Sequence, residues 1–124
     1  AELIQTLQKV IAPYPIPLPV VEIAEQATNA EGVAYMQKIV EQINRNKESF
    51  IQSIENLPVV TQVFPSDANF VLIEMTEAQN IHNYLKSQHI YVKKQSGKLD
   101  KMLRISIGTE EEMSRVVQAL TRYN

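Results

Sequence analysis

A chain of 124 residues is long enough for one domain with a buried core. Its 12 basic and 14 acidic side chains give a formal net charge of −2, which argues against a dedicated binder of nucleic acid or anionic membranes. The absence of cysteine excludes disulfides and thiolate metal sites, and two histidines are too few for a histidine metal cage. No apolar run reaches membrane-spanning length and no signal peptide is evident, so a cytoplasmic protein without a metal site is expected.

The first part of the chain has the periodicity of helices. Apolar residues at helical spacing predict a helix over 2–11, and the alternating prolines of 12–19 end it in a rigid extended elbow. Within the elbow, Tyr14 either packs as a hydrophobic plug or presents its hydroxyl to a cleft. Proline is favoured in the first turn of a helix, so Pro19 is expected to open a second helix.

A third helix, over 31–56, is predicted to be the longest element. Thr28 and Glu31 have the spacing of a capping box at its start, and its polar side, with Asn46 and Lys47, is expected to face water. Such a helix would be about 38 Å long, against a radius of gyration of about 14 Å for a globule of this size. This length suggests a spine that connects to something further, and we expect the chain to be a fragment of a longer one.

From Pro58 onward the apolar period changes from 3.6 to 2, which is typical of strands. Strands are predicted over 59–64, 69–75, 90–92 and 102–107, and helices after capping boxes at 76–79 and 109–112. We therefore expect one α/β domain over 1–124, with a helical part over 1–57 and a mixed sheet with helices over 58–124. Three helices would precede a β-β-α-β-β-α two-layer sandwich.

Arg104 is the most informative residue for a binding function. Strand alternation places Leu103 and Ile105 on one face of the strand and Arg104 and Ser106 on the other. Burying an arginine inside an apolar strand is costly unless an anion meets it. Three interpretations stay open: a bidentate grip on a ligand carboxylate or phosphate, an internal ion pair, or an exposed sheet face.

Arg104 also belongs to a cluster of basic residues around one hairpin, with Asp100 as the acid among them. The cluster consists of Lys93, Lys94, Lys98, Lys101 and Arg104. Its field favours anionic small molecules, although lysines on a solvated hairpin also discourage edge pairing. Nucleic acid is disfavoured because no aromatic residues interleave with the lysines.

Asn69 follows a predicted turn, and its amide either caps that turn or faces a ligand from the strand end. His82 and His89 have no partner spacing that suggests catalysis, and neither a glycine-rich phosphate loop nor a nucleophile elbow is present. The residues by themselves therefore indicate at most part of an active site.

Three segments resemble histidinol-phosphate aminotransferases, which are pyridoxal-phosphate enzymes of the aspartate aminotransferase fold. The segments are VIAPYPIP at 10–17, DANFVL at 67–72 and LRISIGTEEE at 103–112. I-A-P-Y-P is the more specific marker, whereas L-R-I-S-I-G-T indicates the wider superfamily. The resemblance covers essentially the whole chain and implies the small C-terminal domain of a fold-type-I enzyme.

The resemblance implies that Arg104 grips the substrate carboxylate. Lys93 stands where relatives often carry an arginine near the anionic end of the substrate, and a lysine lacks the bidentate fork. Arg104, Lys93 and Asn69 are thus the candidate substrate-binding residues. No lysine here matches the one that holds the cofactor covalently, so we assign no catalytic, cofactor-binding or metal-binding residue and expect an inactive fragment without bound cofactor.

The parent enzyme implied by the resemblance is a homodimer that uses pyridoxal phosphate in histidine biosynthesis. It transfers an amino group between glutamate and imidazole-acetol phosphate, two small anionic substrates. The alternatives are another aminotransferase of the superfamily, a stand-alone amino-acid-binding regulatory module, and a scaffold domain built on the long helix. Loss of the large domain should expose apolar surface on the first two helices, so the fragment is expected to self-associate.

Overall fold

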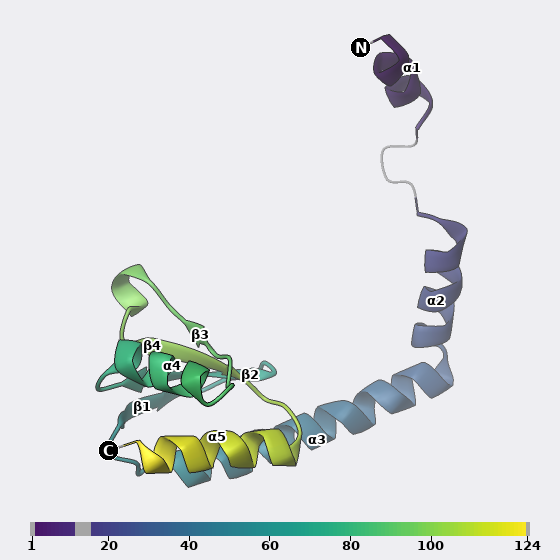
Figure 1. Ribbon diagram of the computed structural model, residues 1–124. Helices are drawn as coiled ribbons and strands as arrows, with labels where there is room; N and C mark the ends of the chain where they lie inside the picture. Colours follow the sequence, from purple (N-terminus) through teal and green to yellow (C-terminus); the bar gives the residue numbers. More distant parts are fainter. Residues whose placement is uncertain (1, 12–15, 124) are drawn as a thin grey trace. The chain divides into compact units, whose positions relative to one another are not determined.

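The computed structural model describes residues 2–11 and 16–123, which form two compact units, Ala1–Lys38 and Ile39–Asn124 (Figure 1). Tyr14 and the centre of the predicted elbow lie outside the described residues. The division between the units falls within a long helix, whose second half packs against the sheet.

The first unit contains α1 (Glu2–Val10), α2 (Leu18–Thr28) and the beginning of α3 (Ala30–Ile54). Pro17 and Pro19 flank the first residue of α2, as expected for prolines that open a helix. The capping box predicted from Thr28 and Glu31 is wrong. Asn29 caps α3 by accepting a 2.8 Å hydrogen bond from the Gly32 N–H. Thr28 is still helical and donates its hydroxyl to the carbonyl four residues earlier instead.

The second unit is built on a four-stranded antiparallel sheet in the order β1-β2-β4-β3. Its elements are β1 (Val60–Phe64), β2 (Phe70–Met75), α4 (Ala78–Ser87), β3 (Lys93–Lys94), the 3₁₀ turn η1 (Gly97–Leu99), β4 (Met102–Ser106) and α5 (Glu110–Arg122). This order confirms the predicted three helices followed by β-β-α-β-β-α. No helix in the described part of the chain has the length and hydropathy needed to cross a membrane.

The third strand is displaced from its predicted position at 90–92 to β3. Residues 89 and 90 end α4 instead: His89 takes a left-handed conformation with φ 57°, and the Ile90 N–H donates to the Leu85 carbonyl at 2.9 Å. This is the six-to-one bond of a helix C-terminus in which the left-handed position is usually glycine. The sequence has His89 there, so the helix end carries no glycine signal.

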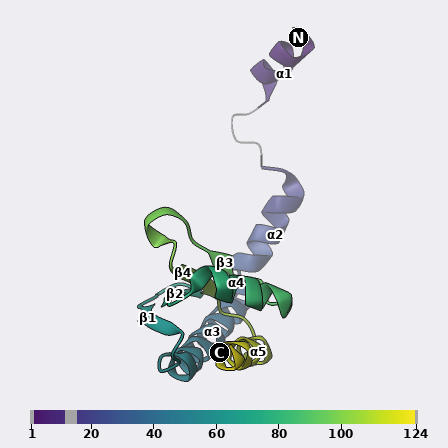
Figure 2. The same ribbon diagram turned by 60° about the vertical axis from the view of Figure 1, so that its left-hand side comes forward.

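One core lies between the sheet and the helices. Every second residue of β2 and β4 is buried, and these side chains pack against apolar residues of α3, α4 and α5. The central members are Phe50, Ile54, Val71, Ile73, Ile81, Leu85, Leu103, Ile105, Met113 and Leu120. Figure 2 shows α5 beside the later part of α3. Within the second unit, α4, α5 and the later part of α3 all pack on this one face of the sheet, and the opposite face carries no helix of that unit.

The prediction that Asn46 and Lys47 face water is wrong. Asn46 is 8% exposed, and its amide donates to the Gly108 carbonyl at 2.8 Å. Half-buried Lys47 donates its ammonium to the carbonyls of Ser66 and Ala68, at 2.8 and 3.1 Å. The loops that lead into β2 and out of β4 pass over this part of α3, and their carbonyls need donors when they leave water.

The capping box predicted at 109–112 is confirmed at the start of α5. The Thr109 N–H donates to the Glu112 carboxylate at 2.8 Å, and the Glu112 N–H donates to the Thr109 hydroxyl at 3.2 Å. The box predicted at 76–79 is wrong, because Glu77 occupies the cap position of α4 without a capping hydrogen bond. Its carboxylate accepts from the Asn80 amide and the Tyr123 hydroxyl, both at 3.1 Å.

Asn46→Ala should lower the free energy of unfolding by about 1–3 kcal/mol, because it leaves the Gly108 carbonyl without its donor. Urea unfolding measures the change. Ser53→Ala is the control on the same helix, since the Ser53 hydroxyl is exposed and bonds only within α3. Equal effects of the two substitutions would contradict a specific tie to the Gly108 loop.

Acidification should weaken the start of α5. The hydrogen bond from the Thr109 N–H, followed by that from its hydroxyl, lowers the pKa of Glu112 in the folded chain. Ionised Glu112 therefore stabilises the fold at neutral pH, and this contribution is lost as pH falls through the folded-state pKa. Urea unfolding as a function of pH should show a smaller acid-induced loss for Glu112→Gln than for Glu111→Gln, which changes the same charge but keeps the capping box.

Candidate functional site

Arg104 lies in the middle of β4, on the sheet face that the helices of the second unit leave open. Leu103 and Ile105 on either side of it are buried, and Arg104 itself is exposed, as the alternation predicts. Its guanidinium carbon is 5.0 Å from the centre of the Phe70 ring. The ion pair found among the described residues joins Arg45 to Glu41 and leaves Arg104 out. Of the three interpretations, the internal ion pair is therefore wrong, and the guanidinium is accessible to an anion from solution.

Lys93 is the cross-strand partner of Arg104. The register of β3 with β4 pairs Lys93 with Arg104 and Lys94 with Leu103. Lys93 is exposed, whereas Lys94 is half-buried and donates its ammonium to the Gln95 carbonyl at 3.3 Å. Like charges placed directly opposite each other on a sheet are destabilising. An anion bound between Lys93 and Arg104 would relieve that repulsion.

Asn69 immediately precedes the first residue of β2, and its carbonyl accepts from the Ile107 N–H at 2.8 Å. Ser66 provides the side chain that closes the preceding turn. Its hydroxyl accepts from the Ala68 N–H at 3.2 Å and donates to the Phe70 carbonyl. The sheet thus brings Arg104 and Lys93 together, whereas Asn69 lies in the loop just before β2, next to the residue that follows β4.

Phe70 is the residue of this face that sequence reasoning missed. The alternation of β2 puts its ring on the outer face, but its contact with Arg104 depends on the pairing of β2 with β4. A strand read alone gives the face of each side chain and not its neighbour on the next strand. The sequence signal for Phe70 is its place in the DANFVL segment, directly after Asn69.

A covalent site for pyridoxal phosphate, the cofactor that the resemblance implies for the parent, depends on a reactive lysine. Such a site needs an enclosed lysine whose amine is free to react. The half-buried lysines, Lys47 and Lys94, donate to backbone carbonyls, and the other lysines of the described ranges are exposed. Residues 2–11 and 16–123 also contain no group of three or more acidic or histidine side chains able to hold a metal ion.

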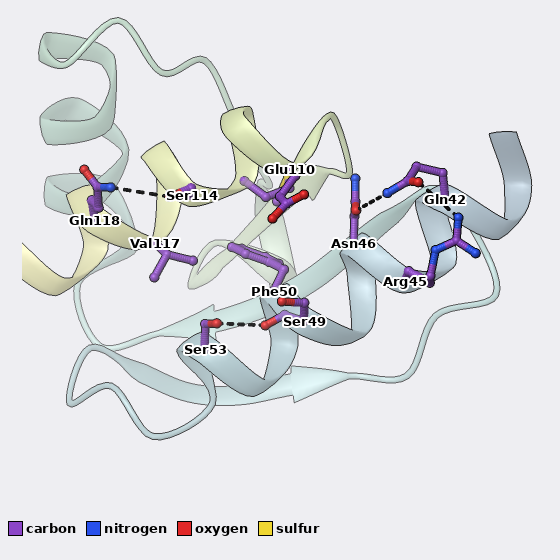
Figure 3. Close-up of a pocket in the computed structure, with 11 residues that line it drawn as sticks. Gln42, Arg45, Asn46, Ser49, Phe50, Ser53, Glu110, Ser114, Val117 and Gln118 are labelled. Carbon is purple, nitrogen blue, oxygen red and sulfur yellow. Dashed lines mark hydrogen bonds between the residues drawn. The ribbon is translucent and has the colours of Figure 1, made fainter.

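A separate groove of about 490 Å³ lies between α3 and α5 (Figure 3). Phe50 and Val117 give it an apolar part, and serine and amide side chains surround them, with the Gln42 amide bonded to Asn46. None of the candidate residues Arg104, Lys93 and Asn69 lines this groove. The candidate substrate-binding side chains and this groove are thus at different places on the second unit.

The chain is similar in sequence to known aminotransferases. Residues 1–120 match the family model described as aminotransferase class I and II. The chain is 40% identical over 123 residues to histidinol-phosphate aminotransferase 1 of Pasteurella multocida, covering 98% of this chain and 35% of that protein. It is 43% identical over 122 residues to the histidinol-phosphate aminotransferase of Serratia proteamaculans, covering 97% of this chain and 34% of that one.

The fold matches as well. The crystal structure of the histidinol-phosphate aminotransferase from Clostridium acetobutylicum aligns with a TM-score of 0.79 at 19% identity, over 97% of this chain and 37% of that chain. At that identity the likeness concerns the fold. The chain spans about a third of the length of the curated relatives it matches, which agrees with a partial-length piece of such an enzyme.

Proposed function

Because this chain belongs to the class I and II aminotransferase family, we propose that it is the C-terminal part of a histidinol-phosphate aminotransferase and contributes to substrate binding. The observation that carries the proposal is the exposed guanidinium of Arg104 beside Lys93 on the open face of the sheet. The names of the relatives that cover nearly the whole chain support the choice of substrate.

Arg104 is proposed to bind a substrate carboxylate through two parallel N–H···O hydrogen bonds, which the planar guanidinium fork provides. Lys93 adds a second positive charge one strand away, without the fork, and Asn69, just before β2, is a third candidate. Both proposed substrates are anionic: glutamate is converted to 2-oxoglutarate, and imidazole-acetol phosphate receives the amino group to become histidinol phosphate. The positive pair therefore faces ligands of complementary charge.

The complete enzyme is proposed to use pyridoxal phosphate, to be a homodimer and to work in the cytoplasm. The cofactor would be held outside the described residues, whose lysines are exposed or engaged by carbonyls. The chain by itself is accordingly proposed to have no transaminase activity. Its contribution to the enzyme is a positively charged binding surface.

Arg104→Gln in the complete protein that contains this chain should reduce kcat/KM for glutamate by roughly 100-fold, which corresponds to about 3 kcal/mol for two charge-assisted hydrogen bonds. Arg104→Lys keeps the charge but loses the fork, so an intermediate loss is expected. Arg45→Gln is the matched control, because Arg45 lies on α3 and pairs with Glu41. If Arg104→Gln behaves like Arg45→Gln, Arg104 does not bind the substrate.

The isolated chain provides the other arm of this experiment. Mixed with pyridoxal phosphate and reduced with borohydride, the 14.1 kDa chain should show only scattered, partial labelling of its exposed lysines and no stoichiometric adduct on a single lysine. A stoichiometric adduct on one lysine would contradict the proposal. A start codon directly before the codon for Ala1, together with glutamate binding by the isolated chain, would favour the amino-acid-binding module instead.

Self-association of the isolated chain is proposed from its uncovered apolar side chains. Leu3 on α1 is 73% exposed and Ile23 on α2 is 66% exposed, and exposed apolar surface favours association. Sedimentation velocity over a concentration series should show species larger than the monomer, reduced in a Leu3→Gln, Ile23→Gln double variant. A strict monomer at high concentration would contradict the expectation.

A further inference from the structure

We propose that Phe70 is a positioning residue for Arg104, whose ring fixes where the guanidinium lies on the open sheet face. The proposal rests on the function proposed above for Arg104 and adds a residue to it. Phe70 need not touch the substrate. It acts by holding the group that does.

The register of β2 with β4 sets up the contact. Phe70 pairs with Ser106 and Leu72 pairs with Arg104, so Phe70 is the diagonal neighbour of Arg104 on the same face. Diagonal neighbours are within reach of aromatic and long side chains. The 5.0 Å between the guanidinium carbon and the ring centre is within the range of about 6 Å for cation–π attraction.

The backbone that carries the ring is tied to α3. The Phe70 carbonyl accepts from the Ser66 hydroxyl, and the Ser66 carbonyl accepts from the Lys47 ammonium at 2.8 Å. Lys47 also donates to the Ala68 carbonyl at 3.1 Å, so the whole turn before β2 is tied to the helix. Phe70 is therefore a half-buried side chain on an anchored strand end.

An exposed arginine loses conformational freedom when it binds a carboxylate. Contact with the ring restricts the guanidinium before the ligand arrives, so less freedom remains to be lost on binding. The contact leaves the N–H groups free, because the ring interacts through its π face and accepts no strong hydrogen bond from them. Phe70 should consequently affect the affinity for the carboxylate more than the rate of the chemical step.

The test uses the complete enzyme with its cofactor. Phe70→Leu should raise KM for glutamate about 2- to 5-fold, the factor expected from an exposed cation–π contact, with a smaller change in kcat. Phe70→Tyr keeps the π face and should leave KM for glutamate near the value of the unsubstituted enzyme. Phe64→Leu is the matched control, because Phe64 lies on the same face but pairs with Leu72 on the side of β2 away from β4.

Two further measurements separate positioning from a general structural role. In an Arg104→Gln background, Phe70→Leu should have no additional effect on KM, because the guanidinium that the ring holds is gone. Trifluorinated phenylalanine incorporated at position 70 keeps the shape of the ring and weakens its π face, so KM should rise although packing is kept. This variant remains informative if Phe70→Leu fails to fold.

The proposal is overturned if Phe70→Leu and Phe64→Leu raise KM equally, if the effect persists without Arg104, or if fluorination leaves KM unchanged. Failure of the proposed function is recognised separately, because Arg104→Gln would then leave KM for glutamate unchanged. A KM that responds to Arg104 but not to Phe70 would retain the binding role of Arg104 and remove the positioning role of Phe70.

Discussion

The antiparallel pairing of β2 with β4 is the constraint on which both the core and the candidate site depend. Val71 and Ile73 lie opposite Ile105 and Leu103, and together they form the floor of the core. The same register puts Arg104 opposite Leu72 on the outer face. A slip by one residue would turn the outer side chains of either strand inward and bury the guanidinium of Arg104 without a partner. The apolar core therefore also keeps the charged face in register.

Helix α3 extends this control to the loops at the end of the two central strands. Asn46 holds the Gly108 carbonyl after β4, and Lys47 holds the Ser66 and Ala68 carbonyls before β2. Two consecutive residues of one helix thus bind both the loop that leaves β4 and the turn that enters β2. These polar contacts lie on the covered side of the sheet, and they help to position the strands whose outer residues form the open face.

Much of this arrangement could be predicted from the sequence, because it depends on local periodicity. The alternation along β4 correctly predicts that Arg104 lies on the opposite face of the strand from Leu103 and Ile105. The capping box of Thr109 and Glu112 correctly predicts where α5 begins. The failures have tertiary causes. Asn46 has the local pattern of a surface residue, and only the loop that passes over it makes it a buried donor. The contact of Phe70 with Arg104 likewise depends on a neighbouring strand 34 positions away in the chain, as the residue numbers show.

The short edge strand β3 also affects how the sheet meets other protein chains. It consists of Lys93 and Lys94 and forms one border of the sheet. An open strand border is a template for pairing with another chain, and lysines discourage such pairing. A bound anion would neutralise part of the charge at that border. The positive charge that is proposed to attract a ligand would thus also protect the edge of the sheet from intermolecular β-pairing, and occupation of the proposed site would weaken this protection.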